Sequence, residues 1–140
     1  MQYLDTSLLV AALTPESRTQ EVQQWLGQQQ PEELAISDWV IAEFSAALAA
    51  KLRAGRVDAS ERAAALSEFA QLCASSFAIL PISRTHFQMA ARFADRHTLS
   101  LRAPDALHVA LCLDHGAVLC TLDRNLSEAC IPLGVLASLL

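Results

Sequence analysis

Short apolar runs alternate along the chain with longer segments in which apolar residues recur every three or four positions. The short runs predict β-strands at residues 2–4, 34–37, 77–80 and 117–121. A fifth strand is expected near residues 131–135, although Pro132 and Gly134 interrupt it. Strands that alternate with helices are typical of an α/β protein whose parallel sheet is covered by helices.

The helical segments carry start and stop signals. Ser37 is expected to cap one helix that ends near Gly55, and Asp58 with Glu61 forms a capping-box pattern before the next. A further helix is expected to open at Ser83. Pro104 suits the first turn of a helix that stops at Gly116. Two other acids stand where helices begin, so Asp5 and Asp123 are candidates for N-caps as well.

Length and composition indicate one soluble domain spanning residues 1–140. The 140 residues are 53% hydrophobic and 18% charged, which favours a dense core over disorder. No signal peptide is evident and no apolar run approaches the roughly 18 residues that cross a bilayer, so we expect a cytoplasmic protein without a membrane partner. The four cysteines form no C-x-x-C pair and are expected to be reduced core residues.

Four acids lie just past or inside apolar segments: Asp5, Glu43, Asp105 and Asp123. Asp5 and Asp123 follow predicted strands, and Asp105 falls in the first turn of a helix, so all three are expected at the carboxyl edge of the sheet. Glu43 lies within a helix on the side that should face the protein, and burial is expected. Buried acids need a positive partner, and a divalent metal ion is the obvious one.

The acids and their neighbours also fit simpler structural roles. Asp5 and Asp123 could simply cap helices, and Asp105 could complement a helix dipole. Asp105, His108 and Cys112 share one helical face and would suit part of a zinc site, although a structural zinc ion needs four ligands. His108 is more simply a polar or half-buried residue near the acids.

The net charge of −5 at first argues against a nucleic-acid partner. Without the four proposed site acids, however, eleven acids stand against ten bases, and bound Mg²⁺ would change the local field further. Nine of the ten bases are Arg, which favours bidentate phosphate contacts. Four of them fall in or just after the one helical stretch before Asp105: Arg84, Arg92, Arg96 and Arg102. A solvated helix face explains the first three of these equally well.

Four strings occur in an order that resembles the PIN domain, and more narrowly the VapC-type toxins of bacterial toxin–antitoxin pairs. They are LDTS at 4–7, IAEF at 41–44, RAPDALHVA at 102–110 and TLDRNL at 121–126. The resemblance covers nearly the whole chain and departs from the family at the apolar C-terminal string IPLGVLASLL. It implies a three-layer α/β/α sandwich with a central parallel sheet of four or five strands.

The same resemblance implies a metal-dependent endoribonuclease that uses Mg²⁺ or Mn²⁺. Asp5, Glu43, Asp105 and Asp123 would form its acidic quartet. The hydroxyl of Ser7 or Thr6 would support Asp5, Thr121 would orient Asp123, and Arg102 is a candidate for binding substrate. The implied partners are a structured RNA substrate, a small cognate antitoxin and a second copy of the chain as a homodimer.

Two rival functions are compatible with acids at these positions. Mg²⁺-dependent phosphatases and phosphoacceptor domains also place acids at strand ends, but they usually need a second acid beside the nucleophilic Asp and a well-placed Lys, whereas Asp5 has no acidic neighbour and Lys51 is the only Lys. The other rival is a non-catalytic PIN-like binding module. The presence of an acid at all four site positions argues against it.

Overall fold

Five parallel strands form the centre of the computed structural model, which describes all 140 residues. The order across the sheet is β3-β2-β1-β4-β5. The first strand in the chain, β1, therefore lies in the middle, where it pairs with β2 on one side and β4 on the other. The strand bounds are Gln2–Leu4 (β1), Leu34–Ser37 (β2), Ala78–Leu80 (β3), Val118–Thr121 (β4) and Ala137–Leu139 (β5).

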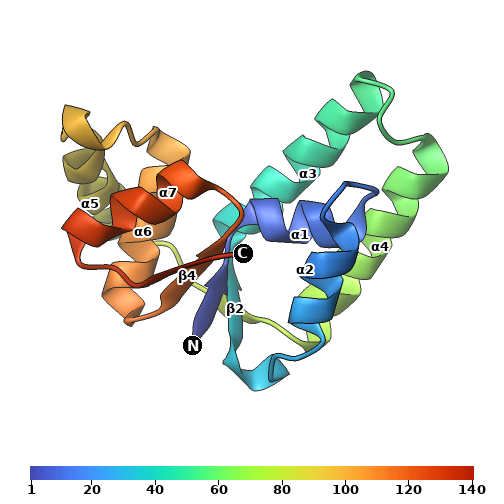
Figure 1. The fold of residues 1–140 in the computed structure, drawn as a ribbon, viewed down its shortest axis with the longest axis horizontal. Helices are drawn as coiled ribbons and strands as arrows, with labels where there is room; N and C mark the ends of the chain where they lie inside the picture. The colour runs from blue at the N-terminus through green and yellow to red at the C-terminus, as the bar shows by residue number, and fades with distance from the viewer.

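Two groups of helices enclose this sheet (Figure 1). One group is α1 (Thr6–Leu13), α2 (Thr19–Leu26), α3 (Asp38–Arg53) and α4 (Ala59–Ser75); the other is α5 (Arg84–Ala94), α6 (Ala103–His115) and α7 (Arg124–Cys130). Short 3-10 turns occupy Pro31–Glu33, His97–Leu99 and Ile131–Leu133. The three-layer α/β/α prediction is confirmed.

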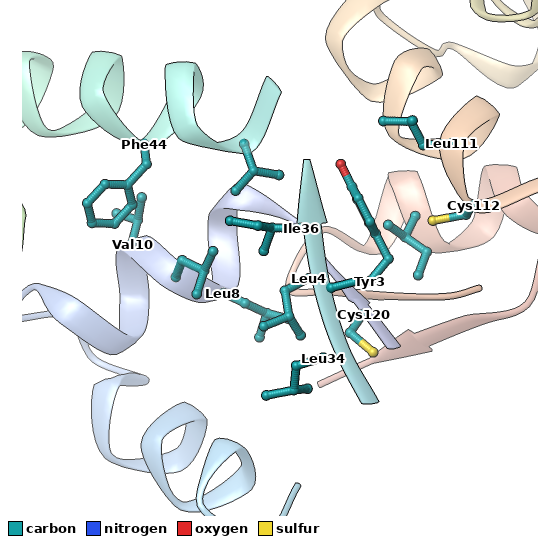
Figure 2. Close-up of a cluster of buried hydrophobic side chains, with 14 of the residues drawn as sticks. Tyr3, Leu4, Leu8, Val10, Leu34, Ile36, Phe44, Leu111, Cys112 and Cys120 are labelled. Atoms are coloured by element: carbon teal, nitrogen blue, oxygen red, sulfur yellow. The ribbon is translucent and has the colours of Figure 1, made fainter. Parts of the chain in front are cut away.

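Alternation along the central strand divides the core between the two helical layers. Tyr3 extends from β1 toward Leu111 and Cys112 of α6, whereas Leu4 lies on the side of α1 and α3 with Ile36 (Figure 2). Successive side chains of a strand point to opposite faces, so a strand covered on both faces must be apolar throughout. Tyr3, Leu4 and Ile36 are all 0% exposed.

The predicted helix signals are confirmed. The side chain of Ser37 caps α3 by accepting from the Val40 N–H at 3.5 Å. Asp58 and Glu61 form the reciprocal capping box of α4, with N···O distances of 2.7 and 2.8 Å. At the end of α6, Gly116 adopts φ +61°, a left-handed conformation that costs other residues more than Gly.

The expected fifth strand near residues 131–135 is wrong in position. Residues Ile131–Leu133 form a 3-10 turn, and β5 follows at Ala137–Leu139, parallel to β4. Pro132 has no N–H to donate to a sheet, and Gly134 ends the 3-10 turn in a left-handed conformation with φ +72° before the strand begins. The two residues that weakened the prediction are those that delay the strand.

The four cysteines are free, as expected, and three of them are buried. None of the helices combines the length and the apolar character that crossing a lipid bilayer requires.

Phe44 should be a principal source of stability for the layer of α3 and α4. Its ring is fully buried and lies 4.1 Å, centroid to centroid, from that of Phe69. We expect Phe44→Ala to lower the free energy of unfolding by about 3–5 kcal/mol, because it removes apolar contacts and leaves a cavity. Phe87→Ala, at a side chain that is 54% exposed, is the matched control and should change it by less than about 1 kcal/mol in urea unfolding. Equal losses in the two variants would contradict this role of Phe44.

Candidate functional site

Asp5 joins the end of β1 to the start of α1. It is only 4% exposed, and its backbone extends into the N-cap position of α1. Its Oδ1 accepts hydrogen bonds from Ser7 Oγ at 2.5 Å and Leu8 N at 3.3 Å, and its Oδ2 accepts from Thr121 Oγ1 at 2.7 Å. Burial raises the pKa of Asp5 above its ordinary value, and these hydrogen bonds oppose that rise.

Thr121 connects Asp5 to Asp123 across two neighbouring strands. Its Oγ1 donates to Asp5 and accepts from the backbone N–H of Asp123 at 2.9 Å. Asp123 in turn caps α7, because its Oδ1 accepts from Asn125 N and Leu126 N. No hydrogen bond reaches its Oδ2, so one oxygen of this carboxylate is free to bind a ligand.

Glu43 is held by side chains from two other elements. Its Oε2 accepts from Thr6 Oγ1 of α1 at 2.5 Å and contacts His108 Nε2 of α6 at 2.8 Å. Burial raises the pKa of Glu43, but the hydrogen bond and charge of His108 lower it. The hydroxyl of Thr6 and the indole of Trp39 lower it further, so that together these groups outweigh burial and the net pKa is lowered. Glu43 is half-buried rather than enclosed, with a side chain that is 23% exposed.

His108 lies at the junction between this site and the core. It is 3% exposed, and its Nδ1 lies 2.8 Å from the hydroxyl of Tyr3, which lies 2.8 Å from Ser37 Oγ. Burial raises the pKa of Tyr3 well above its ordinary value, so its hydroxyl stays protonated at neutral pH. Since the ionised carboxylate of Glu43 can only accept, His108 Nε2 donates to it.

Asp105 lies one helical turn before His108 in α6 and therefore on the same face. Burial raises the pKa of Asp105, and the negative charge of Asp123 raises it further, whereas Arg102 and His108 lower it. Arg102 Nε lies 3.5 Å from Asp105 Oδ2, and the Arg102 side chain is 81% exposed. Asp105 is thus within electrostatic reach of both His108 and Asp123.

The four predicted acids gather at the carboxyl edge of the sheet, where Thr121 and His108 connect them. Thr121 joins Asp5 to Asp123, and His108, which contacts Glu43, acts on the pKa of both Asp5 and Asp105. No three of the four bring ligand oxygens within 4.8 Å of one another. An ion bound by three of these acids would therefore require side-chain movements or bridging water molecules.

An open hollow of about 620 Å³ lies beside Asp123. Asp123 and Arg124 form one wall, and the remaining lining residues come mainly from α1 and α3: Thr6, Ser7, Val10, Glu16, Ala47 and Leu122. Asp123 thus faces an open surface that a large ligand can reach, and Thr6 and Ser7, which contact Glu43 and Asp5, line the same hollow.

Several expected supporting contacts differ in detail. Ser7, and not Thr6, is the hydroxyl that contacts Asp5, while Thr6 donates to Glu43. Thr121 holds the backbone of Asp123 rather than its carboxylate. His108 is near the acids as expected but is buried rather than half-buried. Asp105, His108 and Cys112 do not form a cluster of metal-ligand atoms, so the alternative zinc site has no support.

Helix capping and metal binding are compatible in this arrangement. Asp5 and Asp123 do cap α1 and α7, as their positions before these helices predict. Each carboxylate oxygen has two lone-pair directions, however, and the hydrogen bonds leave at least one direction open on every acid, with Asp123 Oδ2 entirely free. An all-oxygen donor set of this kind fits Mg²⁺ or Mn²⁺.

Comparison with known proteins agrees with the fold. The sequence profile of the PIN domain matches residues 2–132. No curated protein sequence matches the chain. Among solved structures, FitAcB from Neisseria gonorrhoeae is 22% identical with a TM-score of 0.74, covering 98% of this chain and 96% of that one.

Two further structures share this arrangement. The sarcin–ricin loop cleaving toxin VapC20 from Mycobacterium tuberculosis is 18% identical, with a TM-score of 0.74 and coverage of 92% and 95%. A toxin–antitoxin complex from Klebsiella pneumoniae is 21% identical, with a TM-score of 0.60 and coverage of 88% and 87%. At these identities the likeness shows the fold alone.

The contact between His108 and Glu43 predicts a pH dependence. Because the folded pKa of Glu43 is lowered, its ionised form stabilises the fold above the ordinary pKa of 4.5, and this contribution is lost as the pH falls through the lowered value. In His108→Gln we expect a higher Glu43 pKa, measured by carboxyl ¹³C NMR titration. Glu21, whose pKa is lowered by Arg18, is the internal control and should not change. An unchanged Glu43 pKa would contradict the role of His108.

Proposed function

The chain belongs to the PIN domain family, and from that premise we propose that it is a divalent-metal-dependent endoribonuclease that cleaves structured RNA. It would act as the toxin of a toxin–antitoxin pair. The observation that carries the proposal is the gathering of Asp5, Glu43, Asp105 and Asp123 at one edge of the sheet, around His108 and Thr121.

In this proposal Asp5 and Asp105 bind the metal directly, and Asp123 completes the site through its free oxygen. Asp5 is suited to this role because hydrogen bonds from Ser7 and Thr121 fix its carboxylate in one orientation. A bound Mg²⁺ or Mn²⁺ would supply the positive charge that offsets the anionic phosphodiester and would lower the pKa of a water molecule.

Glu43 would hold a water molecule or accept its proton. Its lowered pKa keeps it ionised at neutral pH, and Thr6 and His108 both contact the same oxygen, Oε2. Asp105 has the opposite tendency, because burial and Asp123 raise its pKa; a bound cation would offset that effect. The two carboxylates are therefore prepared for different roles by their surroundings.

Arg124 and Arg102 are the cations best situated for an RNA backbone. Arg124 lines the open hollow beside Asp123, and Arg102 is highly exposed beside Asp105. Guanidinium groups bind phosphate in a bidentate manner. Sequence-specific recognition of RNA mostly targets unpaired loops, which favours structured RNA as the substrate class, and VapC20, with the same fold, is described as cleaving such a loop.

A nuclease of this kind requires an inhibitor, and we propose a small cognate antitoxin, as in the Klebsiella complex. Leu8 and Leu9 are fully buried core residues and cannot belong to its binding surface. Trp25 and Leu26 are half-buried on α2 and remain available. Further exposed apolar side chains suit protein contacts: Phe87, Leu113, Ile131 and Leu136.

Replacement of a central acid should separate catalysis from folding. We expect Asp5→Asn and Asp105→Asn to reduce Mn²⁺-dependent cleavage of a structured RNA to background, since each removes a charge that holds the cation. Both variants should remain folded by circular dichroism, because burial disfavours the ionised forms that they lose. Asp95→Asn, at an exposed position, is the matched control and should cleave like the wild type.

The same cleavage assay and two further measurements discriminate between the rival functions. Full cleavage by a contaminant-free Asp5→Asn preparation would exclude the proposed assignment. Strong turnover of a small phosphomonoester with intact RNA would favour the phosphatase, and absence of Mn²⁺ binding by calorimetry would favour the non-catalytic module.

Association with partners forms a separate prediction. We expect the purified chain to sediment as a homodimer at micromolar concentration, and a short neighbouring gene product to bind it and suppress cleavage. Sedimentation that shows only monomer would contradict the homodimer. Cleavage that every neighbouring gene product leaves unchanged would contradict the antitoxin.

A further inference from the structure

A second cluster of metal-ligand side chains lies where α5 begins and α6 ends. His86 is in the first turn of α5, and Asp114 and His115 are the last two residues of α6. One ligand atom of each residue lies within 4.8 Å of the other two. Asp114 follows Asp105 by nine residues, roughly 14 Å along the helix, so this cluster is separate from the acid site.

The distances within the cluster suit a tetrahedral ion. Asp114 Oδ2 lies 3.0 Å from His86 Nε2 and 3.9 Å from His115 Nε2. Ligands about 2.0–2.1 Å from a tetrahedral zinc ion lie roughly 3.3 Å from one another. The imidazole rings of His86 and His115 are 6.0 Å apart and tilted by 34°, so modest side-chain rotations would bring the three atoms to that spacing.

His115 supplies an independent sign that a ligand is missing. Its Nε2 is buried and has no hydrogen-bond partner, since Asp114 at 3.9 Å is too distant to be one. A buried polar nitrogen without a partner costs free energy, which a metal ion bound to its lone pair would recover.

Ser83 lies against the other ring nitrogen of His86 and offers a hydroxyl that could support a metal-bound ring. His86 Nδ1 accepts from the Ser83 N–H at 3.0 Å, and it also lies 3.3 Å from Ser83 Oγ. With Nδ1 as an acceptor, a neutral His86 carries its proton on Nε2 and donates it to Asp114. Binding of a metal to Nε2 would move that proton to Nδ1, so the contact with the Ser83 N–H would have to be replaced by one in which Nδ1 donates to Ser83 Oγ.

We propose that His86, Asp114 and His115 bind one Zn²⁺ ion, with a water molecule as the fourth ligand, and thereby join the start of α5 to the end of α6. Two imidazoles and one carboxylate favour zinc over the harder Mg²⁺. The Asp114 side chain is 53% exposed, so an ion can enter from solvent and retain its water.

The test uses the full-length chain without an affinity tag. Zn²⁺ binding is measured by calorimetry, and Co²⁺ absorption reports whether the coordination is tetrahedral. The wild type should bind one ion, and Zn²⁺ should raise its melting temperature. His115→Gln should lose both effects while remaining folded, because the nitrogen that it replaces makes no hydrogen bond. His97→Gln, at an exposed histidine, is the matched control and should bind like the wild type.

Two more variants locate the ion. Asp5→Asn should bind Zn²⁺ like the wild type, which separates this site from the acid site and from the proposed nuclease function. Ser83→Ala should weaken binding about 10- to 100-fold, the range typical for loss of a supporting contact. Absence of binding at micromolar Zn²⁺, equal binding by His115→Gln, or loss of binding in Asp5→Asn would each overturn the proposal.

Discussion

The buried contact between His108 and Glu43 is the interaction on which the candidate site depends. It connects α6 to α3, and through Tyr3 and Ser37 it extends across β1 to β2. Ionised Glu43 can only accept, so His108 donates to it, and the contacts of His108 with Tyr3 and of Tyr3 with Ser37 continue the network into the sheet. Four elements are thereby fixed relative to one another by polar groups that burial would otherwise make costly.

Two of the acids have structural tasks at the positions proposed for metal binding. Asp5 and Asp123 satisfy the free N–H groups at the starts of α1 and α7, so the fold itself requires acceptors there. An Asn or Ser would cap a helix as well. What capping does not explain is the burial of Asp5 at a cost to its ionised form, or the presence of Asp105 near Asp123, where each charge opposes the other.

The sequence was sufficient for the features that depend on neighbouring residues. The bounds of β1 and β2, the caps at Ser37 and Asp58 and the end of α6 at Gly116 follow from local patterns. The contacts of His108 did not, because Tyr3 and His108 are 105 positions apart and no local pattern pairs them. Likewise, Ser7 and Thr6 are equivalent in sequence, and only the turn into α1 decides which hydroxyl meets Asp5.

The placement of the charges explains how an acidic protein could bind the proposed RNA substrate. The net charge of −5 would repel RNA if it were spread evenly, but four acids gather at the edge where a cation would neutralise part of their charge. At the same edge Arg102 lies beside Asp105, and Arg124 follows Asp123. If a cation binds as proposed, it would turn a site that repels phosphate into one that attracts it, so cation binding would determine when the proposed substrate can approach.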